Sequence, residues 1–428
     1  MKTIKSLCAM LAVLAFTACS SNSDDADSGN EPKVWHITLQ ASMGEVTNRA
    51  LSPGEDNAIT ASFAVGDEVK VLKANGSVVC TLTANTAGTS TTLNGTISGS
   101  FAVNEVLTLR YLSATPNYDG QDGTLAGISS YAEGSLKVSS ADPLTFESTS
   151  VTLTPMQSIT KFSFKDNTNA NINVKTFGIA ATGLVQSIAA NGTETVGAVT
   201  GTLATANTEV YVALRNTSTT LQTYSFYIQD DAGNWYKGTK NATLTNGKNY
   251  TATVSLTKLS DELTSSSTEG TVGVIGNLPA IVIDLGGTIG KKAVALMNTG
   301  ALCPEHYGKY YTFANQSSDL KDGWVVPTQA ELTALAGKTN ACVTQNGVNG
   351  GLFTIGSEKL FLPIAGFYDN NSTPTLLNDT WGYYWSSTST TTEGYAYSLQ
   401  FNGVITSSSL NSSEKIDGLT VRPFHSLP

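Results

Sequence analysis

Residues that carry most enzyme chemistry are scarce in this chain of 428 amino acids. No Cys-x-x-Cys pair is present, so the ligand spacing of a zinc knuckle is missing. No paired carboxylates or nucleophilic triad can be recognised. The chain has three histidines, far apart and without His or Cys at metal-ligand spacing: His36, His306 and His425. We therefore predict that the protein is not an enzyme and that it has no metal centre or cofactor built on these residues.

Charged residues are also few. Asp, Glu, Lys and Arg together make up 14% of the chain, and the net charge is -10. A nucleic-acid partner would require a basic face, so this balance argues against one. Hydrophobic residues make up 40%, and 39 glycines accompany abundant Thr, Ser and Asn, which is typical of β-sandwiches rather than helices. The length exceeds what one hydrophobic core serves, so we expect about three domains.

Long apolar runs are missing as well. The run over residues 7–16 follows two lysines and is too short to span a membrane as a stable helix, so it indicates a targeting segment. Ala18 followed by Cys19 resembles a bacterial lipobox. The resemblance implies a signal peptide over residues 1–19 and a lipid on Cys19 that anchors the precursor to the surface of the outer membrane. The acidic, serine-rich residues 20–33 are then the tether.

The first stretch after the tether has a regular pattern. In residues 35–43 every second residue is apolar, and the residues between them are polar or small. A period of two predicts a strand that buries one face against a sheet. The apolar face includes Trp35, Ile37 and Leu39.

A turn-rich polar segment, residues 47–54, follows this strand and is expected on the surface, open to proteolysis. Arg49 is the only Lys or Arg between Lys33 and Lys70. A protease that cuts after arginine would therefore find one target here and leave Ala50 as the new first residue.

Successive hairpins are expected after the cleavable segment. Asn75-Gly76 between two strand-like segments is a strong hairpin signal. The region resembles the fimbrillin family of pilus proteins, which implies two tandem transthyretin-like β-sandwiches, over residues 34–156 and 157–258. The resemblance rests on the leader with Cys19, on Arg49-Ala50, and on Phe63, Gly66, Asp67, Leu153, Met156, Ile159, Phe162, Phe164, Leu244, Gly247, Lys248 and Tyr250.

One short helix is expected near the C-terminus. Thr328 is placed as its N-cap, Glu331 completes a capping box, and Gly337 can end it in a left-handed conformation. Leu332 and Leu335 form its buried stripe. The aromatic residues around this helix alternate as in half-buried strands, so the sequence predicts a small α+β domain.

This last region resembles the C-type-lectin-like domain of the Fibrobacter succinogenes major paralogous type. The resemblance implies an α+β domain over residues 271–428, joined by a Ser/Thr-rich acidic linker over residues 259–270, in a chain that is otherwise mainly β. It does not specify a ligand, because fold does not imply function. The residues that carry it are Val282, Asp284 to Gly286, Asn298 to Ala301, Pro304, Glu305, Tyr307, Gly308, Gly323 to Thr328, Leu360 to Gly366, Trp381 to Ser387 and Gly418 to Pro423.

A loop of about 14 residues in this domain is long enough to suspect function. Its aromatic side chains can stack on a sugar or anchor a protein, and its Asx oxygens are of the kind that calcium prefers, although the signature triplets of calcium-dependent lectins are missing. Turn formation is the alternative for the Asx residues. The candidate ligand residues are Tyr368, Asp369, Asn370, Asn371, Asn378, Asp379, Trp381 and Tyr383.

Two cysteines, Cys303 and Cys342, lie in the same domain. Outside the cytosol they can form a disulfide, but two cysteines in one domain need not face each other, so the sequence leaves both arrangements open.

Three hypotheses for function follow. The first is an adhesive subunit at the tip of a fimbrillin-type pilus, processed after Arg49, which accepts a strand from the next subunit and presents the lectin-like domain to a glycan or protein. The tip position is expected because the residues after Arg422 include two prolines and lack alternation. The second is a lipid-anchored surface module that does not polymerise. The third and weakest hypothesis is an enzyme.

Overall fold

The computed structural model describes residues 33–44, 47–48, 62–259, 262–369, 375–377, 380–402 and 408–428. Strands dominate these residues and one α-helix is present among them, so the mainly β fold class is confirmed. No helix in this part of the chain is both long and apolar enough to cross a membrane. The chain forms two compact units: Met1–Ser42, Ser62–Ala114 and Glu133–Leu153 in unit 1; Met43–Ala61, Thr115–Ala132 and Thr154–Pro428 in unit 2.

Unit 1 is one sheet closed on itself. Its strands follow the order β6-β3-β4-β5-β1-β9-β7-β8, and an additional pairing of β6 with β7 closes a barrel. The Asn75-Gly76 hairpin is confirmed, because β3 and β4 pair on either side of it and Gly76 has a φ of 86°. The strands are β1 Val34–Met43, β3 Glu68–Leu72, β4 Val78–Ala84, β5 Ser90–Ser98, β6 Val106–Tyr111, β7 Ala132–Ala141, β8 Leu144–Phe146 and β9 Ser150–Pro155.

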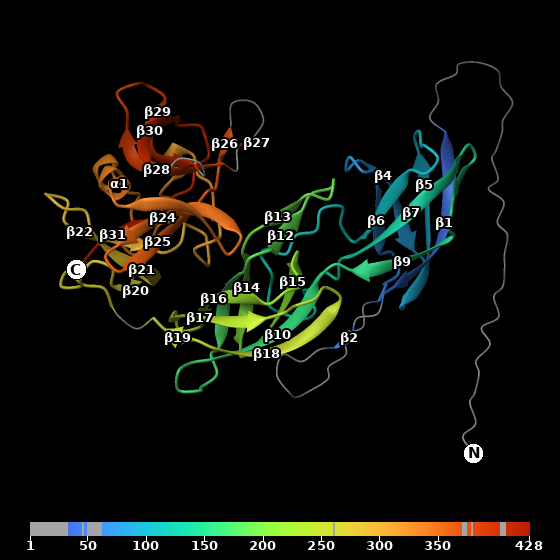
Figure 1. Ribbon diagram of the computed structural model, residues 1–428, viewed down its shortest axis with the longest axis horizontal. Helices are drawn as coiled ribbons and strands as arrows, with labels where there is room; N and C mark the ends of the chain where they lie inside the picture. Colours follow the sequence, from blue (N-terminus) through green and yellow to red (C-terminus); the bar gives the residue numbers. More distant parts are fainter. Residues whose placement is uncertain are drawn as a thin grey trace. The chain divides into compact units, whose positions relative to one another are not determined.

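Unit 2 begins with a sandwich of two sheets, in the orders β13-β12-β15-β10-β18-β2 and β14-β11-β16-β17-β19 (Figure 1). Its core contains the mutually contacting rings of Phe162, Phe164 and Phe226. Its strands are β2 Thr47–Asn48, β10 Ser158–Lys165, β11 Val174–Ala180, β12 Leu184–Ile188, β13 Glu194–Val196, β14 Val199–Asn207, β15 Glu209–Asn216, β16 Gln222–Asp230, β17 Trp235–Ala242, β18 Lys248–Ser255 and β19 Thr257–Lys258.

The connection between β6 and β7 belongs to unit 2 although both strands lie in the unit 1 barrel. Tyr118 in this connection is 1% exposed and packs in the core of the sandwich. The side-chain amide of Gln121 pairs with the backbone of Ala213 as a strand would, accepting at 2.8 Å and donating at 2.9 Å. The sequence pattern does not reveal this insertion, because its contacts are with residues far along the chain.

The C-terminal domain of unit 2 surrounds one helix with short sheets, in the orders β20-β21-β22-β31, β23-β24-β25, β26-β27 and β28-β29-β30. Its elements are β20 Val272–Ile275, β21 Leu278–Asp284, β22 Lys291–Ala295, the 3-10 turn η1 Phe313–Asn315, α1 Gln329–Ala336, β23 Asn340–Gln345, β24 Val348–Ile355, β25 Glu358–Pro363, β26 Phe367–Asp369, β27 Thr375–Leu377, β28 Trp381–Ser389, β29 Tyr395–Asn402, β30 Ser409–Glu414 and β31 Phe424–Ser426.

The helix α1 follows its predicted local signals at one end and departs from them at the other. Thr328 and Glu331 form the reciprocal capping box, and Leu332 and Leu335 are buried. The expected left-handed end is wrong, since Gly337 has a φ of -72° and is right-handed. Gly337 instead donates its N–H to the carbonyl oxygens of the last turn, which lets the chain continue at once into β23.

Removing the cap is expected to destabilise this domain measurably. Thr328→Ala leaves the amide of Glu331 without its acceptor, and the expected loss is about 1 kcal/mol of unfolding free energy. Thr333→Ala is the matched control, because the Thr333 hydroxyl only donates to the Gln329 carbonyl within the helix. Denaturant unfolding followed by tryptophan fluorescence measures both variants, and equal losses would contradict the capping role.

Residues 259–270, the expected linker, are held at two described points. Leu259 is 8% exposed and Leu263 is fully buried, and each belongs to a hydrophobic cluster with residues of the C-terminal domain. The amide of Leu263 also donates to Val274 at 3.1 Å. This segment is therefore packed against the domain that it precedes.

Candidate functional site

The first strand, β1, occupies an interior position in the unit 1 barrel, between β5 and β9. It pairs antiparallel with β5 over residues 34–42. On its other side the Gln40 amide donates to the Thr149 carbonyl at 2.9 Å. Both backbone edges of β1 are thus used, so a barrel without β1 would have two unpaired strand edges facing each other.

The predicted alternation of β1 is present. Ile37 and Leu39 are 6% and 2% exposed, and Met43 is buried on the same face. Trp35, the other residue predicted on that face, is only half-buried, because it lies at the end of the strand with its ring against Phe101. Burying each of the aliphatic side chains contributes roughly 1.5–3 kcal/mol, so β1 supplies a large part of the stability of unit 1.

The predicted processing and lipidation residues, Arg49, Ala50 and Cys19, lie outside the described residues. Directly before Arg49, the short strand β2 pairs in parallel with β18 of unit 2, with Thr47 opposite Lys248 and Asn48 opposite Asn249. The segment that a cut after Arg49 would release therefore contains strands of both units.

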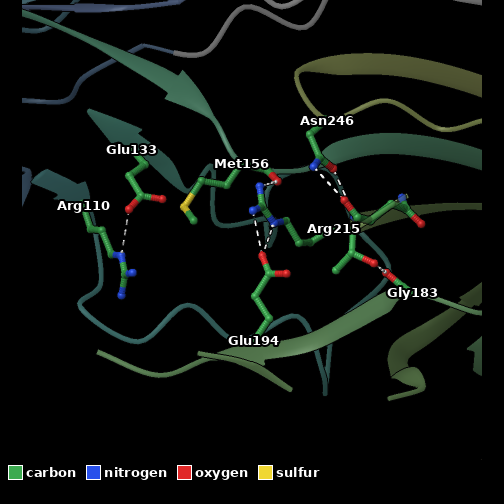
Figure 2. A network of polar contacts seen from close by, with 9 residues as sticks. Arg110, Glu133, Met156, Gly183, Glu194, Arg215 and Asn246 are labelled. Carbon is green, nitrogen blue, oxygen red and sulfur yellow. Dashed lines mark hydrogen bonds and ion pairs between the residues drawn. The ribbon is translucent and has the colours of Figure 1, made fainter. Parts of the chain in front are cut away.

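The other arginines of the chain are Arg110, Arg215 and Arg422, and each is hydrogen-bonded within the folded structure. Figure 2 shows the first two. Arg110 is 4% exposed, and its guanidinium donates to the Ala114 carbonyl at 2.7 Å and lies 3.5 Å from Glu133. Arg215 donates to Glu194 through both Nε and Nη2. It also donates through Nη1 to the Met156 carbonyl. Arg422 is fully buried.

Half-buried aromatic residues gather in the C-terminal domain around the predicted ligand residues. Tyr368 contacts Tyr310 with a centroid separation of 4.9 Å, and Tyr383 contacts Phe367 at 4.9 Å and Trp381 at 6.3 Å. We call these five residues the aromatic cluster. These contacts form two groups, Tyr310 with Tyr368 and Phe367 with Tyr383 and Trp381. The structure thus brings the predicted Trp381 and Tyr383 together, while sequence reasoning missed Tyr310 and Phe367.

The remaining predicted ligand residues are placed less fully. Asp369 is half-buried in the β26–β27 hairpin, and Asn370, Asn371, Asn378 and Asp379 lie outside the described residues. Among the residues that the structure describes, no group of three His, Cys, Asp or Glu is arranged to hold a metal ion.

Burial sets the protonation of the aromatic cluster. It raises the pKa of Tyr310 far above the ordinary value for tyrosine, and the neighbouring Tyr307, Tyr368 and Tyr384 add to the rise. Burial and the carboxylate of Asp417 also raise the pKa of Tyr383. The Tyr310 hydroxyl already donates to the Ala365 carbonyl. The Tyr383 hydroxyl is neutral at physiological pH and can donate to a polar ligand such as a sugar hydroxyl or a peptide carbonyl.

The disulfide between Cys303 and Cys342 is not formed, which corrects one of the two arrangements left open. Cys303 is fully buried with Ala180 and Ala198 of the sandwich. Cys342 lies in β23 and its thiol donates to the Asn402 carbonyl. Burial raises the pKa of both thiols, so they are protonated and unreactive at neutral pH.

The sandwich and the C-terminal domain of unit 2 share a packed boundary, which we call the seam. Trp235 of β17 is 2% exposed within the core of the C-terminal domain, and its indole N–H donates to the Asn277 carbonyl at 2.9 Å. Gly178 lies so close to Leu302 and Cys303 that an added Cβ would be 2.6 Å from the Leu302 oxygen. Residues of the two parts therefore pack directly against each other.

Polar groups complete the seam. His306 Nδ1 accepts from the Gly308 amide at 3.0 Å, which leaves the proton on Nε2 to be donated to Asp119 at 2.9 Å. Thr200 donates to the same carboxylate through its amide and its hydroxyl. Burial alone would raise the pKa of Asp119, but the hydrogen bonds from His306 and Thr200 outweigh it and hold that pKa below its ordinary value.

Acid is expected to weaken the seam. Because the folded pKa of Asp119 lies below the unfolded one, its stabilisation is present at neutral pH and is lost as the pH falls from the ordinary pKa of aspartate through the lower folded value. Asp119→Asn is expected to cost about 1–3 kcal/mol at pH 7 and to flatten the acid dependence of unit 2 unfolding. Thermal unfolding between pH 2.5 and pH 7 tests this, and an unchanged acid slope would contradict it.

Comparison with known proteins gives one partial family match and several distant structural likenesses. A family described as a domain of unknown function, DUF8237, matches residues 354–424, which is a minority of the chain. No curated protein matches the sequence.

Three solved structures show the range of these likenesses. A Bacteroides ovatus protein proposed to act in cell adhesion has a TM-score of 0.30 and 13% identity, over 54% of this chain and 97% of its own. A fimbrial assembly protein from Parabacteroides distasonis has a TM-score of 0.26 and 10% identity, over 52% of this chain and 92% of its own. A variant of the shaft pilin of Lactobacillus rhamnosus has a TM-score of 0.23 and 14% identity, over 54% of this chain and 99% of its own.

Proposed function

We propose that this chain is an adhesive, non-enzymatic subunit of a fimbrillin-type pilus, in which the segment through Arg49 is removed and a strand of the next subunit takes the place of β1. The observation that carries the proposal is the interior position of β1, which is hydrogen-bonded on both edges and buries its apolar face in the barrel. Removing an N-terminal strand of this kind leaves a groove that an alternating strand fills by β-augmentation.

A cut after Arg49 would also release β2, which pairs with β18. The loss of β2 uncovers the edge of β18 in unit 2.

We place the chain at the tip of the pilus. The residues after Arg422 are not a spare strand, because β31 pairs with β22 over residues 424–426. In addition, the Pro428 carbonyl accepts from the Ser265 amide at 2.8 Å. This tail belongs to the sheet of its own domain, so it is not available for donation to a neighbour.

The C-terminal lectin-like domain then presents the ligand-binding surface. The aromatic cluster combines stacking faces with neutral hydroxyls, a combination suited to a glycan or a polar protein surface. A glycan array probed with the full chain and with a Trp381→Ala variant tests this part, and equal binding by both would exclude the aromatic cluster.

A lipid-anchored surface module that does not polymerise is the second candidate. The observation in its favour is that the unit 1 barrel is already closed by its own β1 in the intact chain. Mass spectrometry separates the two: an N-terminus at Ala50 in assembled fibres supports the pilus subunit, whereas lipid retained on Cys19 without fibres supports the anchored module.

An arginine-specific protease is expected to cut the native chain once, after Arg49. Arg110, Arg215 and Arg422 are held by carbonyls and carboxylates, so local unfolding would be needed to expose them (Figure 2). Intact-mass analysis during limited digestion measures the products, and Arg49→Gln is the control that should leave the chain uncut. Early cleavage after Arg215 would contradict the expectation.

A further inference from the structure

The contact at the beginning of β1 differs from the rest of the strand. The ring of Trp35 meets the edge of Phe101 at a centroid separation of 6.1 Å and an interplanar angle of 68°. Both rings are half-buried, whereas the Ile97 opposite Trp35 on β5 is fully buried. Trp35 therefore rests on a preformed aromatic surface at the rim of the barrel.

Phe101 is held in place by residues that do not belong to β1. The ammonium of Lys73 lies 4.7 Å from the centroid of the Phe101 ring, a cation–π contact. The same ammonium donates to the Ser100 carbonyl at 2.6 Å and lies 3.3 Å from Glu105. Glu105 in turn accepts from the Ala102 amide. Phe101 is thus contacted by Lys73, directly after β3, and its own loop is held by hydrogen bonds that do not involve β1.

The deeper positions of β1 discriminate less. Ile37 and Leu39 are buried, and hydrophobic side chains of similar volume replace one another at buried positions at small cost. An aromatic contact has a preferred geometry and contributes beyond the area that it buries. Discrimination between incoming strands therefore depends mainly on the residue that takes the place of Trp35, at the beginning of β1.

We infer that Phe101, supported by Lys73, is a specificity pocket of the groove and that an incoming strand must carry an aromatic side chain in register with Ile97, where Trp35 now lies. This inference rests on the proposed strand exchange and names what the incoming strand must offer. Any strand in which apolar residues alternate with polar ones can fill the core positions of Ile37 and Leu39. A strand with a small or charged residue at the Trp35 position leaves the Phe101 ring uncovered.

The test uses the full chain cleaved after Arg49, in which the fragment of residues 1–49 remains until it is displaced. A fluorescent peptide of residues 33–44 is titrated in, beside peptides carrying Trp35→Phe, Trp35→Ala and His36→Ala. The Trp35→Ala peptide is expected to bind about tenfold more weakly, and the Trp35→Phe peptide within about threefold of the parent. The His36→Ala peptide is the control, because His36 is exposed, and it should bind as the parent does.

Variants of the protein at Phe101 complete a double-mutant cycle with the Trp35 peptides. In Phe101→Ala the penalty for Trp35→Ala is expected to shrink to about twofold to threefold, because the partner ring is gone. Phe101→Leu, which keeps an apolar side chain, serves if Phe101→Ala fails to fold, and Val103→Ala at an exposed loop position is the control.

The outcomes distinguish the two claims. If no peptide displaces the fragment, strand exchange itself fails and the specificity pocket fails with it. If peptides displace the fragment but the Trp35→Ala peptide binds as tightly as the parent, or its penalty is the same in the Phe101 variant, the specificity pocket is overturned while strand exchange stands.

Discussion

A chain that begins at Ala50 is expected to lose the folded structure of unit 1 while the sandwich and the C-terminal domain of unit 2 stay folded. The deletion removes Ile37, Leu39 and Met43 from the barrel core, each worth roughly 1.5–3 kcal/mol. Their sum approaches the whole unfolding free energy of a typical domain, about 5–15 kcal/mol. The paired edges of β5 and β9 are lost at the same time.

Hydrogen exchange read by mass spectrometry measures this effect strand by strand. Protection should vanish in β5 and β9 and persist in β10 and β16 of the sandwich. A chain that begins at Lys33 keeps β1 and is the matched control. Adding the peptide of residues 33–44 should restore protection to the shortened chain. A unit 1 that stays protected without the peptide would show that β1 is dispensable and would remove the physical basis of strand exchange.

The parts of this structure that the sequence predicts are those set by local rules. The alternation in β1 predicts which face is buried, because successive side chains of a strand point to opposite sides. The capping box at Thr328 is likewise decided by residues three apart.

The parts that the sequence does not predict depend on residues distant along the chain. The hydrogen bond between His306 and Asp119 spans 187 positions, and neither residue has a local signal that points to the other. Phe101 likewise lies 66 positions after Trp35, which it contacts, and sits in a loop without periodicity. Pattern analysis assigns faces to strands, but it does not show which surfaces meet.

Arg422 is expected to be the most sensitive single position in the C-terminal domain. Its side chain is fully buried and donates to the carbonyls of Ala295 in β22 and Phe361 in β25, each at 3.0 Å. Burial lowers the pKa of its guanidinium to about 10, against the favourable effect of the neighbouring Tyr384 in β28. One side chain therefore connects three sheets of the domain.

Arg422→Ala leaves two buried carbonyls without donors and opens a cavity among these sheets. An unsatisfied buried carbonyl costs about 1–3 kcal/mol, and truncating a large core side chain adds a similar amount, so we expect a loss of about 4 kcal/mol or more. Lys309→Ala in the same domain is the control, since its pair with Asp319 is exposed and worth less than about 1 kcal/mol. Denaturant unfolding, with hydrogen exchange in β22 and β25, measures both. Similar midpoints for the two variants would show that the guanidinium does not hold the sheets together, whereas separate loss of protection in each sheet would show that it does.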